Sequence, residues 1–126
     1  MFNNLIKKPK EKAPLYFGTG NRYLNILHTK LRNSCSGLYS DLIRVGLVNS
    51  PKCTCSSPLE NSHHFLLDCP LYNNQRHVLF QSIYQNFMMI RIHLPLLLKG
   101  SSNLTEIENT NLFLMIQNYL KDTNRF

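Results

Sequence analysis

Acidic residues are scarce in this 126-residue chain. They are Glu11, Asp41, Glu60, Asp68, Glu106, Glu108 and Asp122. These seven are scattered, and no Asp-Asp pair occurs. Polymerases and endonucleases gather carboxylates around two metal ions. The sequence therefore predicts no polymerase or endonuclease activity. No nucleophile, base and orienting acid can be assembled around His63 or His77 for a hydrolase either. We expect a protein that is not an enzyme.

Long hydrophobic runs are also missing. The longest apolar stretch, residues 83–98, is interrupted by polar residues and by Pro95. It is not a clean apolar helix of the roughly 20 residues that cross a bilayer. The opening MFNNLI is too short and too polar for a secretory signal. We expect no membrane association and an intracellular location, nuclear or cytoplasmic, where cysteines stay reduced.

No segment alternates apolar and polar residues long enough to predict a strand, and no internal repeat occurs. The spacing of apolar residues instead predicts helices, so the fold class is mostly α. The first helix covers residues 22–33. The second starts at Ser36 as N-cap and stops at Gly46. A longer helix starts at Pro70. Its predicted buried stripe is Leu71, Val78, Leu79, Ile83 and Phe87.

Two further helical segments follow. Residues 94–98 form a short apolar segment closed by Gly100. Thr105 and Glu108 have the spacing of a capping box, in which each side chain satisfies a backbone N–H of the other residue. The stripe predicted for this last helix is Leu112, Met115, Ile116, Tyr119 and Leu120.

Positive charge is concentrated at the start of the chain. The formal net charge is +7, and residues 1–34 carry +6 of it, from seven basic residues and one acid. We expect residues 1–14 to be a flexible, disordered basic arm and residues 15–126 to form one helical domain. Such charge favours nucleic acid as a partner. The candidate contacts are Lys7, Lys8, Lys10, Lys12, Arg22, Lys30, Arg32 and Arg44. A solvated surface is the alternative for each.

Three of the four cysteines stand in residues 53–70, CTCSSPLENSHHFLLDCP. Cys53, Cys55, His64 and Cys69 follow the pattern C-x-C-x8-H-x4-C. Four thiol and imidazole ligands and no open position are typical of structural Zn²⁺ sites. The sequence therefore predicts a central irregular CCHC zinc knuckle over residues 51–70. A disulfide is the alternative, although Cys53 and Cys55 are badly placed to pair with each other.

Two ligand assignments stay open at this stage. His63 competes with His64, and the x4 spacing to Cys69 favours His64. Cys35 is expected to be a small buried hydrophobic residue, or else to replace the histidine in an all-cysteine site. The apolar residues after His64 are expected to anchor the knuckle in the core. They are Phe65, Leu66 and Leu67.

The stretch LNILHTKLRNSCSGLYSDLIRVGLVNSPKCTCSSPLENSHHFLLDCPLYNNQRHVLF resembles the C-terminal segment of non-LTR (LINE-like) retrotransposon polyproteins, downstream of the reverse transcriptase. The resemblance covers about residues 14–126, and HFLLDCP is its most specific part. It implies that Cys53, Cys55, His64 and Cys69 are the metal ligands. Ser56 departs from the family, which commonly has glycine there, so the loop lacks glycine's tolerance of positive φ.

The resemblance implies an accessory module that helps a separate polymerase domain hold template RNA or target DNA. A second hypothesis is a zinc-stapled structural or protein-interaction domain with no nucleic-acid affinity. Its interface would include Phe87, Met88, Met89 and Ile90, which a lone domain would leave exposed.

Overall fold

The computed structural model describes residues 13–126, so the predicted arm lies almost entirely outside the described residues. The described chain is helical and contains no strand. Its short helical turns are η1 (Leu15–Gly18), η2 (His64–Asp68) and η3 (Pro70–Tyr72). Its α-helices are α1 (Arg22–Arg32), α2 (Tyr39–Arg44), α3 (Asn73–Asn86), α4 (Leu94–Lys99) and α5 (Glu106–Thr123). The predicted class, mostly α with an irregular cysteine-rich segment in the middle, is confirmed.

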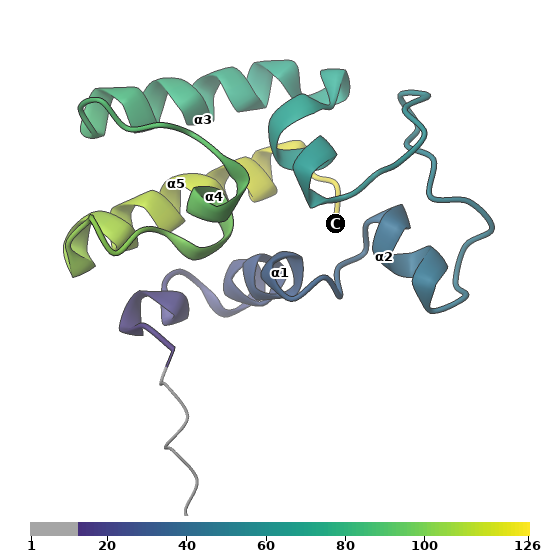
Figure 1. Cartoon of the computed structure of the whole chain (residues 1–126), viewed down its shortest axis with the longest axis horizontal. Helices are drawn as coiled ribbons and strands as arrows, with labels where there is room; N and C mark the ends of the chain where they lie inside the picture. The colour runs from purple at the N-terminus through teal and green to yellow at the C-terminus, as the bar shows by residue number, and fades with distance from the viewer. Residues whose placement is uncertain (1–12) are drawn as a thin grey trace, which may run out of the picture.

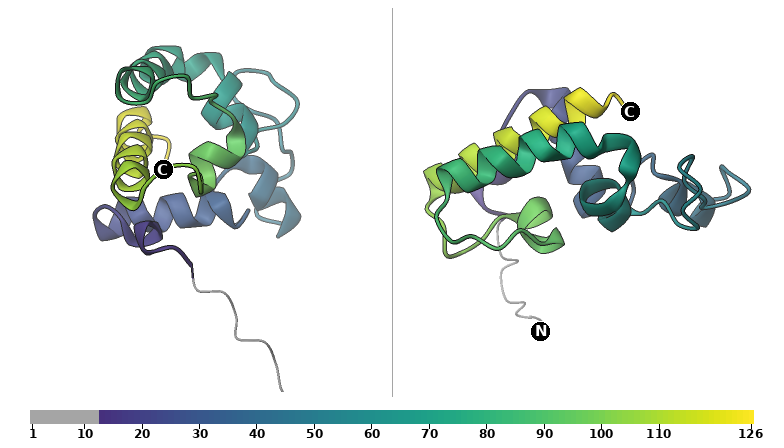
Figure 2. Two further views of the ribbon diagram at one scale, coloured as in Figure 1. Left: turned by 60° about the vertical axis from the view of Figure 1, so that its left-hand side comes forward. Right: turned by 90° about the horizontal axis from the view of Figure 1, so that it is seen from above.

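Helix α5 is the centre of the helical part. It contacts α3, α1 and η1, and the short α4 packs against both α1 and α5 (Figures 1 and 2). The segment from α2 to η2 extends from one end of this helical part (Figure 1). The metal-ligand residues therefore lie at the end of the helical part rather than inside it.

One apolar core joins the helices to the turn that follows His64. Its fully buried members include Leu31, Leu38, Phe65, Leu66, Ile83, Leu97, Leu112, Phe113 and Ile116. Phe65 and Leu66 are buried and Leu67 is partly buried, as the sequence predicted. Burial of a Phe or Leu side chain contributes about 1.5–3 kcal/mol. These two residues therefore tie the ligand-bearing turn firmly to the core.

The start and buried face of α3 differ from the prediction. Pro70 begins the 3-10 turn η3, and α3 itself starts at Asn73. Leu71 and Val78 are exposed rather than buried. The inward stripe runs through Arg76, Leu79, Ile83 and Phe87. The charged Arg76 can lie on this face because its guanidinium donates to backbone carbonyls.

Helix α2 also begins later than predicted, at Tyr39, and its N-cap residue is Leu38. The Ser36 hydroxyl instead donates to Asp41 Oδ2 (2.6 Å) and accepts from the Leu38 N–H (3.2 Å). The end of the helix is as predicted. Gly46 has φ +78°, and the Gly46 and Leu47 N–H groups donate to Ile43 and Leu42 in a Schellman motif.

The remaining predicted boundaries are close to those observed. The capping box is present, with the Glu108 N–H donating to Thr105 Oγ1 (3.1 Å) and the Thr105 N–H donating to Glu108 Oε1 (2.9 Å). Gly100, with φ +72°, caps α4. On α1, Leu24 and Leu31 are buried and Tyr23 is exposed.

Candidate metal centre

The four predicted ligands meet in space. One ligand atom from each of Cys53, Cys55, His64 and Cys69 lies within 4.8 Å of all the others. The Cys53 and Cys69 Sγ atoms are 3.7 Å apart, and Cys55 Sγ is 3.3 Å from His64 Nε2. Sulfur atoms bound at about 2.3 Å to one tetrahedral metal ion would be separated by about 3.8 Å. The four residues are therefore positioned to hold one metal ion.

A tight turn presents the first two ligands. The Cys53 N–H donates to the Ser57 carbonyl (2.9 Å), and the Ser56 N–H donates to the Cys53 carbonyl (3.0 Å). Ser56 has φ +80°, a region that favours glycine. The turn thus adopts the conformation that glycine would adopt easily, and the serine carries the strain.

A π-helical turn presents the other two ligands. In η2 the Cys69 N–H donates to the His64 carbonyl (2.7 Å), which spans five residues. Such a turn brings residues five apart to the same side, as the x4 spacing requires. Asn61 Oδ1 accepts from the His64 N–H (2.9 Å) and so fixes the start of the turn.

Arg76 and Tyr119 hold this turn from behind. The buried Arg76 guanidinium donates to the carbonyls of Leu66 (3.1 Å), Phe65 (3.2 Å) and Cys69 (2.8 Å). The Tyr119 hydroxyl donates to the Phe65 carbonyl (2.6 Å). The last carbonyls of a helical turn have no partner within the turn. Here the charged Arg76 guanidinium donates to them, and hydrogen bonds from a charged donor are strong.

Glu60 and Arg125 hold the other side of the site. The buried Glu60 carboxylate accepts from Arg125 Nη2 (2.7 Å) and Nε (3.0 Å) and from the Tyr39 N–H (2.9 Å). Glu60 Oε2 also lies 3.9 Å from Cys53 Sγ. The hydrogen bonds to Glu60 raise the pKa of Arg125. One carboxylate thus joins the start of α2, the cysteine loop and the end of the chain.

Sequence reasoning missed Arg76, Tyr119, Glu60 and Arg125 as supports of the site. The clearest available signal was Arg76, a charged residue spaced three and seven residues from Leu79 and Ile83. Glu60 and Arg125 are 65 residues apart in sequence, so no local pattern connects them.

The two open assignments are resolved by position. The His63 side chain is exposed, and its Nδ1 lies 2.9 Å from Asp68 Oδ2, outside the four-residue group. Cys35 is exposed, so its prediction as a buried residue is wrong, and it does not belong to the group. Cys35 follows the end of α1 and does not enter the core. None of the four cysteines is in a disulfide.

The Cys69 and Cys55 thiols differ in acidity. Burial raises the pKa of the Cys69 thiol to about 12. A backbone hydrogen bond from Ser57 lowers the pKa of the Cys55 thiol. Metal ions bind the thiolate, so binding must displace the Cys69 proton and metal affinity must fall as the pH falls.

The basic residues predicted to bind nucleic acid fall into three groups. Lys7, Lys8, Lys10 and Lys12 lie outside the described residues. Arg22 and Lys30 are exposed on α1. Arg32 and Arg44 are engaged within the protein. Arg32 Nε donates to the Leu98 carbonyl (2.7 Å) above the Phe17 ring, and Arg44 pairs with Asp41 (2.9 Å) and the Ser34 carbonyl.

Comparisons with protein-family models, with curated proteins and with solved structures give no match to this chain. Among residues 13–126, no helix is both long enough and apolar enough to cross a membrane.

Proposed function

We propose that this chain is a zinc-binding module that assists nucleic-acid binding by a retrotransposon reverse transcriptase. The observation that carries the proposal is the convergence of Cys53, Cys55, His64 and Cys69 within 4.8 Å. Thiolate-rich tetrahedral sites select zinc or iron–sulfur clusters, and an imidazole with three thiolates is a frequent zinc set. The resemblance to the C-terminal segment of non-LTR retrotransposon polyproteins supports the biological context.

The metal would have a structural role. Four protein ligands leave no position for a substrate or an activated water. Three thiolates and one Zn²⁺ give the site a charge of about −1, so the knuckle itself would not attract phosphate. Its task would be to fix α2 and the cysteine loop against the helical part.

The basic surface supports nucleic acid as the partner. The chain carries a net charge of +7, and residues 13–40 contain no acid. Arg22 and Lys30 stay exposed on α1. Contacts of this kind are mainly to phosphates, so binding would depend strongly on salt and weakly on sequence.

The metal assignment is tested by the zinc content of the purified protein. We expect roughly one zinc ion per chain, as for a single closed four-ligand site. Cys69→Ser should lose the metal. Cys35→Ser and His63→Ala are matched controls from outside the group and should retain it. Full zinc content in Cys69→Ser would contradict the assignment.

The nucleic-acid assignment is tested by binding to single-stranded RNA and to nicked duplex DNA. Affinity should fall by at least an order of magnitude between about 50 mM and 200 mM salt, since each phosphate contact releases counterions. Absence of binding at low salt would refute this part of the proposal and leave the metal site intact.

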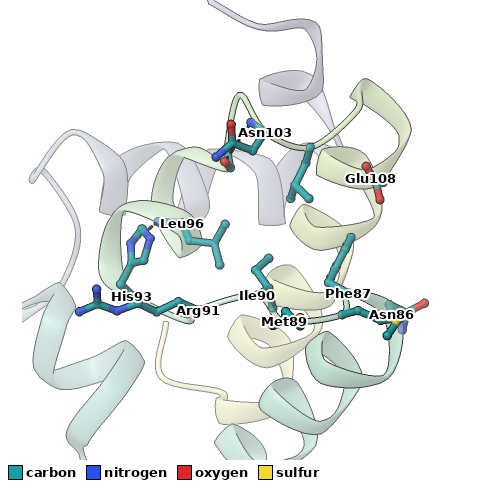
Figure 3. A pocket seen from close by; sticks show the side chains of 12 residues that line it. Asn86, Phe87, Met89, Ile90, Arg91, His93, Leu96, Asn103 and Glu108 are labelled. Atoms are coloured by element: carbon teal, nitrogen blue, oxygen red, sulfur yellow. Dashed lines mark hydrogen bonds between the residues drawn. The ribbon is translucent and has the colours of Figure 1, made fainter.

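The alternative, a protein-interaction domain, is favoured by one observation. Met88 and Met89 are 92% and 99% exposed at the turn after α3. They border a pocket of about 680 Å³, in which Ile90 and Leu96 are seen in Figure 3. Phe87 is buried and Ile90 is partly buried, so Met88 and Met89 are the fully exposed residues of the predicted patch.

Sedimentation at several concentrations tests this alternative. Self-association that is lost in Met88→Ser/Met89→Ser, together with no affinity for nucleic acid, would favour the interaction domain. A monomer that binds RNA would favour the nucleic-acid module.

A further inference from the structure

A second hollow lies between α1 and α5, and it shares no lining residue with the pocket beside Met88 and Met89. Its volume is about 620 Å³. The two helices that form its walls run next to each other in Figures 1 and 2. Residues central to its chemistry are Tyr23, Leu27, Gln117, Asn118, Lys121 and Phe126. We call this hollow the α1–α5 groove.

The groove combines an apolar floor with an exposed aromatic ring. Leu24 and Leu120 are buried residues of its lining, and Phe126 also lines it. Tyr23 is 59% exposed although it stands on a helix whose other face enters the core. An exposed ring beside an apolar hollow is the kind of surface on which a nucleobase stacks, since every base has a π face.

The polar groups of the groove are mostly carboxamides. Asn21, Gln117, Asn118 and Asn124 all line it. Gln117 is 1% exposed; its Nε2 donates to the Thr19 carbonyl (2.9 Å), and its Oε1 has no hydrogen-bond partner among the described residues. Gln117 is therefore part of the buried wall, whereas Asn118 and Asn124 are exposed. Their carboxamides both donate and accept, which matches the donor and acceptor edges of nucleobases.

The charge around the groove is positive. Lys121 lines it from α5, and Arg22 and Lys30 are exposed on α1. No acid occurs between residues 13 and 40, which include all of α1. The nearest acid in sequence to Lys121 is Asp122, and it faces a different hollow between α3 and α5. The groove thus offers cations to a phosphate chain without a competing carboxylate on its α1 wall.

We infer that the α1–α5 groove binds an unpaired nucleotide of single-stranded nucleic acid. The base would stack on Tyr23, the exposed carboxamides of Asn118 and Asn124 would face its edge, and Lys121 would contact a flanking phosphate. A base paired in a duplex shows only its edges, so the groove requires an unpaired base. This inference rests on the proposed function and names the form of nucleic acid that it would take.

The groove is connected to the metal centre through Phe126, one of its lining residues. The Phe126 ring lies 5.5 Å from the ring of Phe65, which follows the ligand His64. Arg125 precedes Phe126 and pairs with Glu60 beside Cys53. Removal of the metal should therefore loosen the end of the groove and weaken binding of an unpaired base.

The test compares two tyrosines that are equally exposed. Tyr23→Ser changes the groove, and Tyr84→Ser, at a position 56% exposed on α3, is its matched control. The probes are a single-stranded RNA of about 12 nucleotides, the same strand in a blunt duplex, and an abasic strand with equal phosphates. Fluorescence anisotropy gives each affinity. Zinc content and melting temperature should be equal in both variants.

We expect the wild type to bind the single strand about tenfold more tightly than the abasic strand. Tyr23→Ser should abolish that difference and leave duplex binding unchanged, whereas Tyr84→Ser should bind like the wild type. Lys121→Gln should weaken binding to all three probes and reduce the salt slope by about one.

Three results would overturn the inference, and they differ in what they say about the proposed function. If the wild type binds no probe, the groove inference and the nucleic-acid part of the proposed function both fail. If it binds but Tyr23→Ser and Tyr84→Ser are alike, only the groove fails. If Tyr23→Ser dissociates an oligomer without changing RNA affinity, the groove is a protein contact.

Discussion

The metal-binding end and the helical end of this molecule differ in how they bury apolar surface. Helices α1, α3 and α5 share a core of fully buried side chains that includes Leu31, Ile83 and Phe113. Between α2 and η2, in contrast, Val45, Leu47 and Leu59 are exposed. That segment lacks a core of its own, so its fold must depend on the metal ligands and on the Glu60–Arg125 pair.

The difference between the two ends indicates why a metal would be needed at one of them. A loop that cannot bury enough apolar surface to offset its conformational entropy needs another source of stability. Four ligands from Cys53 to Cys69 supply it over a short stretch of chain. The helical end needs no such support, because α1, α3 and α5 share a buried apolar core and the capping box satisfies the start of α5.

Metal removal should have the largest effect, and it should act on the metal-binding end alone. Chelation should unfold the segment around Cys53 and α2 while α3 and α5 keep their structure, because structural zinc contributes about 10–16 kcal/mol in small sites. Hydrogen exchange would show the loss of amide protection in α2 first. Equal loss of protection in α5 would show that the two ends form one cooperative unit.

A cavity in the helical end should have the complementary effect. Phe113→Ala removes a fully buried ring that stacks on Phe17 and makes an edge-to-face contact with Tyr16. It should destabilise the protein by about 3–5 kcal/mol. Zinc content should remain that of the wild type, as measured on protein kept below its melting temperature. Loss of metal in this variant would mean that the ligand geometry depends on the α1–α5 packing.

His28 should make the helical end sensitive to acid. Burial lowers its folded-state pKa to about 4 from an ordinary 6.5, and its Nε2 donates to the Leu97 carbonyl (2.8 Å). Above pH 6.5 the imidazole is neutral in both states and its contribution is complete. Between pH 6.5 and 4 the unfolded chain binds the proton and the folded one does not. Stability should therefore fall by up to about 3 kcal/mol over this range.

The difference between the wild type and His28→Gln isolates this effect from the ligand thiols and His64, which both proteins share. Glutamine keeps a donor for the Leu97 carbonyl and does not titrate. Chemical unfolding at several pH values should give a shallower acid slope for the variant. Parallel curves would contradict the assignment.

Ser56→Gly should give the smallest effect, and it acts at the metal-binding end. Ser56 has φ +80°, a conformation that strains a residue with a Cβ. Glycine should relieve the strain and stabilise the loop by about 0.5–1 kcal/mol, reduced by the greater entropy of the unfolded chain. Zinc affinity in a competition titration should rise by a few-fold. Gly46→Ser, at φ +78° in the α2 C-cap, is the reverse control and should destabilise.

Local patterns predicted much of the structure correctly. The Thr105–Glu108 capping box and the stop at Gly46 involve neighbours within a few residues, so propensity and backbone geometry decide them. The four-ligand spacing is also local, since Cys53 and Cys69 belong to one short segment. The basic charge of the first third is a property of composition alone.

Predictions failed where a residue's environment depends on distant parts of the chain. Val78 was assigned to the core by its spacing, but Arg76 occupies the buried face with Leu79 and Ile83, and Val78 is exposed. Cys35 was assigned to the interior by residue type, yet it lies exposed after α1.

By itself, the sequence determined the helical class, the positive charge and the set of residues able to hold a metal, because these depend on residue type and on spacings of a few positions. Only the tertiary structure decided that Arg76 supports the ligand turn, that Glu60 joins Arg125 beside Cys53, and that α1 and α5 enclose a groove. The physical reason is that a contact between residues far apart in sequence depends on the path of the whole chain, which no local pattern encodes.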